Sequence, residues 1–164
     1  MDKNSDQIIK LAQKVLNIES QEILMASKNI SSGFSDAVNE ILNCKGRIVL
    51  SGMGKSGHIA RKIASTFAST GTPAFFMHPG EASHGDLGMI TKDDIVIFFS
   101  NSGKSHELIS IFSTIKRIGA KIIGISGNSS SELANETPAN VSMLKEVVAP
   151  VFKAVLKFLP ATIR

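Results

Sequence analysis

RIVLSGMGKSGHIARKI, residues 47–63, is the stretch that decides how the chain folds. Its apolar run 48–50 has the length and β-branching of a strand buried on both faces, and the strand ends abruptly in a Ser/Gly-rich turn at 51–57 that carries one lysine. An amphipathic helix follows, because apolar residues recur at four-residue spacing from Ile59 to Phe67. The turn therefore predicts an anion site, since the first N–H groups of a helix lack partners within the helix.

The same succession of strand, turn and helix recurs along the chain. Apolar strands are predicted at 74–77, 94–99 and 121–125, and the last two end in Ser/Gly-rich turns at 100–105 and 126–131. Continuous apolar strands that alternate with helices indicate a parallel sheet with helices on both faces. Right-handed connections then bring these turns to the carboxyl edge of the sheet.

The composition fits one globular domain. The chain has 164 residues, of which 43% are hydrophobic and 20% charged, and its net charge of +4 is scattered along the sequence. This charge favours anionic small molecules over nucleic acid as partners. A single cysteine, Cys44, and no recognisable signal peptide predict a cytoplasmic location, and the apolar segment 151–159 is too short to cross a membrane.

We expect a single domain over residues 1–164. Its expected parts are N-terminal helices (1–45), a parallel α/β core (46–146) and a divergent tail (147–164). Helical periodicity predicts one long helix over 5–29, or two helices joined near Asn17, and a further helix at 34–42 before the first strand.

Two nucleotide-binding motifs are matched only in part. Residues 52–57 fit the G-x-G-x-x-G pattern, but a dinucleotide site needs an acidic residue about 20 positions further on, where this chain has Met77. Two Gly-Lys-Ser triplets resemble the end of a nucleotide phosphate loop, yet Val49 and Phe98 stand where that loop has its first glycine. Neither motif predicts a nucleotide site.

Serine hydroxyls and helix N-termini at the strand ends suit a phosphate monoester. A single turn of this kind is explained equally well by tight backbone geometry, but three in register at one sheet edge favour a phosphorylated ligand. The candidate ligand-binding residues in these turns are Ser51, Gly52, Ser56, Ser100, Asn101, Ser102 and Ser105.

The acidic and histidine side chains near these turns can each be given either a structural or a functional role. Glu107 lies in the first turn of a predicted helix, where it either complements the helix dipole or serves as a carboxylate base beside the phosphate. His78, Glu81, His84 and Asp86 are of the types that bind metals, but their spacing matches no zinc pattern. We therefore expect no required metal.

Residues 52–90 and 100–108, GMGKSGHIARKIASTFASTGTPAFFMHPGEASHGDLGMI and SNSGKSHEL, closely resemble the sugar isomerase (SIS) domain of bacterial D-arabinose 5-phosphate isomerases. The resemblance covers about residues 1–146 and implies a flavodoxin-like three-layer α/β/α sandwich. It also implies a cofactor-free interconversion of D-ribulose 5-phosphate and D-arabinose 5-phosphate through an enediol, which leads to the Kdo sugar of lipopolysaccharide. A homodimer or homotetramer is implied as well, because SIS domains usually build their pocket between subunits.

The resemblance also implies roles for individual residues. The matching catalytic positions are Lys55, Glu107 and Glu146, the substrate-binding positions are Gly71, Thr72 and His84, and the position that takes up inhibitory zinc is His78. In this scheme Lys55 pairs with developing negative charge and Glu107 removes the proton beside the carbonyl.

Two departures from the family leave other functions open. Family members commonly carry glutamate where this chain has Lys104, and they carry a catalytic histidine beyond the Glu146 position, whereas no histidine follows His106 here. We expect the tail 147–164 to be truncated, so that apolar surface is exposed where a helix would cover one sheet face. The alternatives to an isomerase are a non-catalytic phosphosugar-binding module and a decayed remnant without function.

Overall fold

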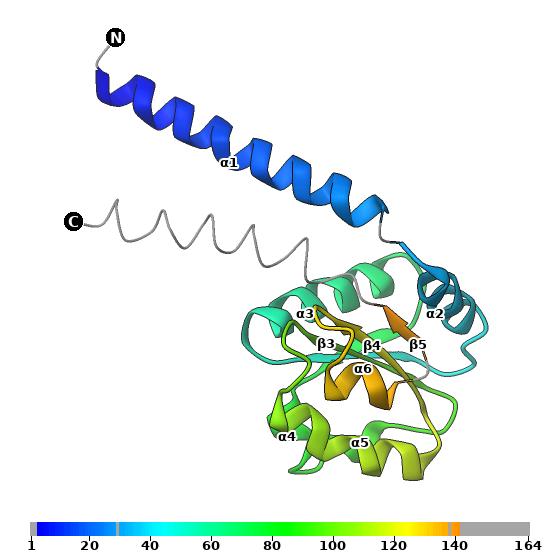
Figure 1. Ribbon diagram of the computed structural model, residues 1–164. Helices are drawn as coiled ribbons and strands as arrows, with labels where there is room; N and C mark the ends of the chain where they lie inside the picture. Colours follow the sequence, from blue (N-terminus) through cyan, green and yellow to red (C-terminus); the bar gives the residue numbers. More distant parts are fainter. Residues whose placement is uncertain (1–2, 29, 138, 142–164) are drawn as a thin grey trace.

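The computed structural model of the chain describes residues 3–28, 30–137 and 139–141 and consists of helices around one parallel sheet (Figure 1). Its strands are β1 (Ile48–Gly52), β2 (Ala74–Met77), β3 (Ile95–Ser100), β4 (Lys121–Ser126) and β5 (Ala139–Val141). Its helices are α1 (Lys3–Lys28), α2 (Ser32–Leu42), α3 (Gly54–Ser69), α4 (Pro79–Ala82), the 3-10 helix η1 (Asp86–Met89), α5 (His106–Ile118) and α6 (Glu132–Glu136).

The strands lie in the order β2-β1-β3-β4-β5, and every neighbouring pair is parallel. This order confirms the predicted α/β class with a flavodoxin-like sheet. The predicted N-terminal helices are also present, and the first is one continuous helix with no break at Asn17. β5 was not predicted, because its three residues show no apolar run.

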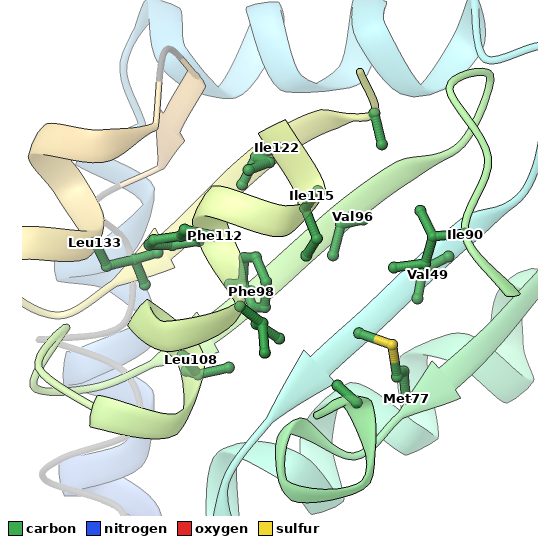
Figure 2. Packing of buried hydrophobic residues seen from close by; sticks show 13 residues of the cluster. Val49, Met77, Ile90, Val96, Phe98, Leu108, Phe112, Ile115, Ile122 and Leu133 are labelled. Carbon is green, nitrogen blue, oxygen red and sulfur yellow. The ribbon is translucent and has the colours of Figure 1, made fainter. Parts of the chain in front are cut away.

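Side chains of each strand alternate between two apolar layers. Val49, Val96 and Phe98 face the layer that contains α5 and α6 (Figure 2). Ile48 and Ile97 face the opposite layer, which contains α2 and α3. Every position of β1 and β3 is buried. Helices on both faces thus explain why the sequence of these strands is apolar throughout.

α1 points away from the sheet (Figure 1). It carries exposed apolar side chains. Ile8, Leu16 and Ile23 are 60%, 64% and 59% exposed. The predicted exposure of a sheet face is not seen at β1 and β3. Most of the exposed large apolar side chains among the described residues lie on α1 and α2. No helix among residues 3–28, 30–137 and 139–141 is both long and apolar enough to cross a membrane.

A buried carboxylate fastens the amino ends of β1 and β3. The Asp94 side chain is 1% exposed, accepts hydrogen bonds from the backbone N–H groups of Arg47 (2.7 Å) and Thr91 (2.8 Å), and forms an ion pair with the Arg47 guanidinium at 3.3 Å. Burial raises the pKa of this carboxyl, but the hydrogen bonds from Thr91 and Arg47 outweigh that effect and hold the pKa below its ordinary value.

The depressed pKa predicts how stability depends on pH. A carboxyl whose pKa is lower in the folded than in the unfolded chain stabilises the fold above the unfolded pKa, and this contribution disappears as the pH falls through the folded pKa. We expect Asp94→Asn to lower the free energy of unfolding at pH 7, and the gap to wild type to narrow between about pH 5 and pH 3. Urea unfolding at several pH values measures the gap; a gap that stays constant contradicts the prediction.

Candidate functional site

The strand order reverses at the carboxyl ends of β1 and β3, and the region above these strand ends, between the starts of α3 and α5, is here called the crevice. From β1 the chain proceeds through α3 to β2 on one side, and β3 then pairs on the other side of β1. As a result α3 and α5 pack on opposite faces of the sheet, and the crevice between their N-termini lies where ligands bind in sheets of this kind. The turns after β1, β3 and β4 therefore share one edge, as predicted.

The end of β1 and the first turn of α3 lie too close together for a side chain at two positions, Gly52 and Gly57. A Cβ atom on Gly52 would lie 3.0 Å from the Phe99 carbonyl oxygen, and one on Gly57 would lie 2.5 Å from the Gly52 carbonyl oxygen. The first turn of α3 is therefore pressed against the strand ends. It carries Lys55, which is exposed, and Ser56, which is half-buried, to the rim of the crevice.

The Ser51 hydroxyl plays a different part from the one expected at the rim. Ser51 is fully buried, and its hydroxyl donates a hydrogen bond of 2.8 Å to the Met77 carbonyl oxygen. It thereby ties the end of β1 to the end of β2. Its role in binding a ligand stays a prediction.

The loop after β3 forms its own network of hydrogen bonds. The Ser100 hydroxyl accepts from the Gly103 N–H at 3.0 Å and lies 3.1 Å from the Ser105 hydroxyl, while the Ser102 hydroxyl accepts from the Lys104 N–H at 3.3 Å. The side chains of Asn101 and Ser102 remain exposed at the rim. The structure thus brings the predicted residues of this loop together.

Glu107 and the loop after β2 approach the crevice on the same face of the sheet. Glu107 is exposed in the first turn of α5, and α4, which follows β2, packs against α5. Ala82 of α4 and Leu108 of α5 belong to one apolar cluster. His84, two residues after Ala82, is exposed in the same region.

His78 caps α4 and does not face a group of metal ligands. Its Nδ1 accepts a hydrogen bond from the Gly80 N–H at 3.2 Å, and its ring stands edge-on to the Phe76 ring at 6.4 Å. No three His, Cys, Asp or Glu side chains gather to hold a metal within the part of the chain that the structure describes. Zinc binding at this position stays a prediction.

The structure places two predicted residues, Gly71 and Thr72, away from the crevice. Gly71 and Thr72 lie between the C-terminus of α3 and the start of β2, which places them at the amino edge of the sheet, opposite the crevice. The predicted strand at 74–77 already placed these two residues before its amino end, whereas their roles as ligand contacts came from the resemblance alone. Glu146 lies outside the described residues.

Sequence reasoning noted the Ser/Gly-rich turn after β4 but assigned no role to its residues. In the structure this turn contacts the loop after β3: the Gly127 N–H donates to the Asn101 carbonyl oxygen at 3.2 Å, and Ser131 packs against Gly103. The recurring Ser/Gly pattern was the available signal. It indicated a shared edge but not which turns touch.

Comparison with known proteins identifies the family. Residues 41–162 match the model of the SIS domain. The chain is 47% identical over 141 residues to arabinose 5-phosphate isomerase KdsD of Pseudomonas aeruginosa, covering 86% of this chain and 43% of that protein. It is 52% identical over 121 residues to KdsD of Yersinia pestis, covering 74% of this chain and 37% of that protein. The chain thus spans less than half the length of these relatives.

A solved structure of similar length supports the same assignment. An Escherichia coli CFT073 protein in complex with arabinose 5-phosphate superposes with a TM-score of 0.80 at 32% sequence identity, and the match covers 100% of this chain and 95% of that chain. Both the sequence match and the shared architecture cover the strands that form the crevice. The chain belongs to the SIS domain family.

Proposed function

We propose that this chain is a phosphosugar aldose–ketose isomerase that interconverts D-arabinose 5-phosphate and D-ribulose 5-phosphate. The observation that carries the proposal is that α3 and α5 start at the same edge of the sheet, on its two faces, with Lys55 and Glu107 in their first turns. The names of the relatives, arabinose 5-phosphate isomerases, support the choice of substrate. Binding of arabinose 5-phosphate by the related E. coli protein supports it further.

The phosphoryl group is held at the helix starts. α3 begins at Gly54 and α5 at His106, so both helices direct N–H groups that have no acceptor within the helix, and the positive ends of their dipoles, toward the crevice. Exposed Asn101 and Ser102 add polar groups at the same rim. A dianionic phosphate monoester matches this arrangement.

The chemical step moves one proton between neighbouring carbon atoms. The Glu107 carboxylate removes the C2 proton of the open-chain aldose, and electron density moves to the carbonyl oxygen to give an enediolate. The Lys55 ammonium stabilises this developing negative charge. The C2 hydroxyl proton then passes to the C1 oxygen, the protonated Glu107 returns its proton to C1, and the ketose forms with no net gain or loss of atoms.

A direct assay tests the activity. Purified protein, shown to be folded by circular dichroism and cooperative unfolding, is incubated with ribulose 5-phosphate, and arabinose 5-phosphate is followed. Turnover supports the proposal, and a folded protein without turnover removes its enzymatic part. Failure of the chain to fold would favour the decayed remnant.

A second candidate function is a module that binds a phosphosugar without converting it. It is favoured by Lys104, an exposed cation at the rim that would strengthen binding of a phosphate group without taking part in proton transfer. This candidate predicts that sugar phosphate raises Tm and that Glu107→Gln leaves the rise unchanged, with no turnover by either protein.

Assembly, zinc and the remaining predicted residues are further parts of the proposal. A homodimer or homotetramer would let Gly71 and Thr72 of one copy approach the crevice of another, since within one chain these two residues lie at the edge of the sheet opposite the crevice.

Catalysis requires no cofactor, zinc at His78 is inhibitory, and Glu146 is a second catalytic carboxylate. Light scattering, zinc titration of the activity and Glu146→Gln test these parts separately.

Lys104 allows a test of the charge at the rim. It is exposed in the loop after β3, close to the first turn of α5. Reversing its charge should weaken binding of a phosphate dianion, and we expect Lys104→Glu to raise the Kd for arabinose 5-phosphate about tenfold at low salt and less at high salt. Calorimetric titration measures the Kd. Lys92→Glu is the matched control, because Lys92 is exposed at the amino edge; an equal effect of both variants contradicts the prediction.

A further inference from the structure

The loop after β3 interlocks with the start of α6 through a glycine and a serine. Gly103 has φ +63° and is buried, and a Cβ atom at this position would lie 2.1 Å from the Ser131 Oγ and 2.3 Å from its Cβ. Ser131 is itself fully buried. The space that a side chain would need at position 103 is therefore filled by Ser131.

Hydrogen bonds hold the two segments together around this contact. The Leu133 N–H donates to the Gly103 carbonyl oxygen at 3.1 Å, and the Gly103 N–H donates to the Ser100 hydroxyl at 3.0 Å. The Ser131 hydroxyl accepts from the Ala134 N–H at 3.2 Å, which fixes its own side chain as the N-cap of α6. The N–H and the carbonyl oxygen of Gly103 are thus both hydrogen-bonded, and the Ser131 side chain beside it has a fixed orientation.

We propose that Ser131 is a positioning residue for the phosphosugar site. It acts through Gly103 by holding the loop 100–105 in one conformation, so that the loop and the first turn of α5 present their polar groups to the phosphoryl group without reordering. Ser131 itself is buried and does not touch the ligand. This inference rests on the proposed function and adds to it a residue from outside the crevice.

A double-substitution cycle tests the inference. Gly103→Ala places a methyl group on Ser131, and we expect the Kd for arabinose 5-phosphate and for inorganic phosphate to rise about tenfold or more. Adding Ser131→Gly removes the clashing atoms and should restore most of the affinity. Ser131→Gly alone should raise KM a few fold and leave kcat nearly unchanged, since glycine is tolerated at helix N-caps but leaves the loop less confined.

A control variant separates the effect of the steric contact with Ser131 from the effect of placing a side chain at a positive φ. Gly119 also has a positive φ, +87°, but a Cβ atom there would meet nothing closer than 3.7 Å. Gly119→Ala should therefore reduce stability without changing the Kd. Circular dichroism and unfolding curves show which variants are folded.

The outcomes distinguish the inference from the function on which it rests. A wild-type protein that binds neither ligand overturns the proposed function, and the positioning role with it. Tight binding by the wild type together with unchanged binding by folded Ser131→Gly overturns the positioning role alone. The same holds if a folded double variant binds no better than Gly103→Ala. Should Gly103→Ala not fold, the comparison of wild type with Ser131→Gly decides.

Discussion

Glu107→Gln should lower kcat by about 10²–10⁴-fold and leave KM nearly unchanged. Glutamine keeps the shape and the hydrogen-bonding reach of glutamate but cannot accept a carbon-bound proton. The position is exposed at the first turn of α5, beside the crevice, so the substitution removes no buried contact. The loss should therefore appear in the chemical step and not in the stability of the protein.

Two measurements and one control make this result specific. The rate of ketose formation gives kcat, and incorporation of deuterium from D₂O at C1 or C2, followed by NMR, reports the proton transfer itself. Glu132→Gln is the matched control, because Glu132 is also an exposed first-turn glutamate, in α6. If Glu107→Gln keeps a third or more of the wild-type rate, Glu107 is not the base and only complements the helix dipole.

Phe98→Ala should destabilise the fold by about 3–5 kcal/mol. Phe98 is fully buried in β3, and its ring meets the Phe112 ring of α5 edge-on with centroids 4.8 Å apart (Figure 2). Truncation removes this aromatic contact and leaves a cavity between the sheet and α5. Because a domain of this size is stable by only about 5–15 kcal/mol, the loss is a large fraction of the total.

The exposed Phe34 of α2 provides the comparison for this prediction. Its side chain is 40% exposed, and we expect Phe34→Ala to cost less than about 1 kcal/mol. Urea unfolding followed by circular dichroism measures both values. If both substitutions lower the free energy of unfolding by a similar amount, packing of Phe98 between the sheet and α5 does not contribute the predicted stability.

Local sequence was enough to place the elements that line the crevice. The runs at 48–50 and 94–99 are apolar at nearly every position because the strands they form are covered on both faces, and a parallel sheet accounts for that pattern. The Ser/Gly-rich turn at 51–57 likewise predicted the start of α3, and Gly52 and Gly57 are needed there for close packing. The shared edge followed from connection rules alone.

Contacts between separate segments could not be predicted from sequence. The fit of Ser131 against Gly103 depends on how α6 returns to the loop after β3, and no periodicity encodes such a pairing. β5 was missed because a three-residue edge strand has too few positions to show alternation. The resemblance supplied Gly71 and Thr72 as ligand contacts, although the predicted parallel strand at 74–77 already puts them at the opposite edge of the sheet.

The position of β1 between β2 and β3 has a consequence for how the protein forms during its synthesis. Ile48 pairs with Ala74 on one side and with Ile95 on the other, so β1 gains its second neighbour only after β3 has left the ribosome. At about 5–20 residues per second this takes several seconds, during which the nascent chain exposes an apolar, unpaired strand edge. We expect chaperones that shield such edges to raise the yield of folded protein most when they act on chains shorter than about 100 residues.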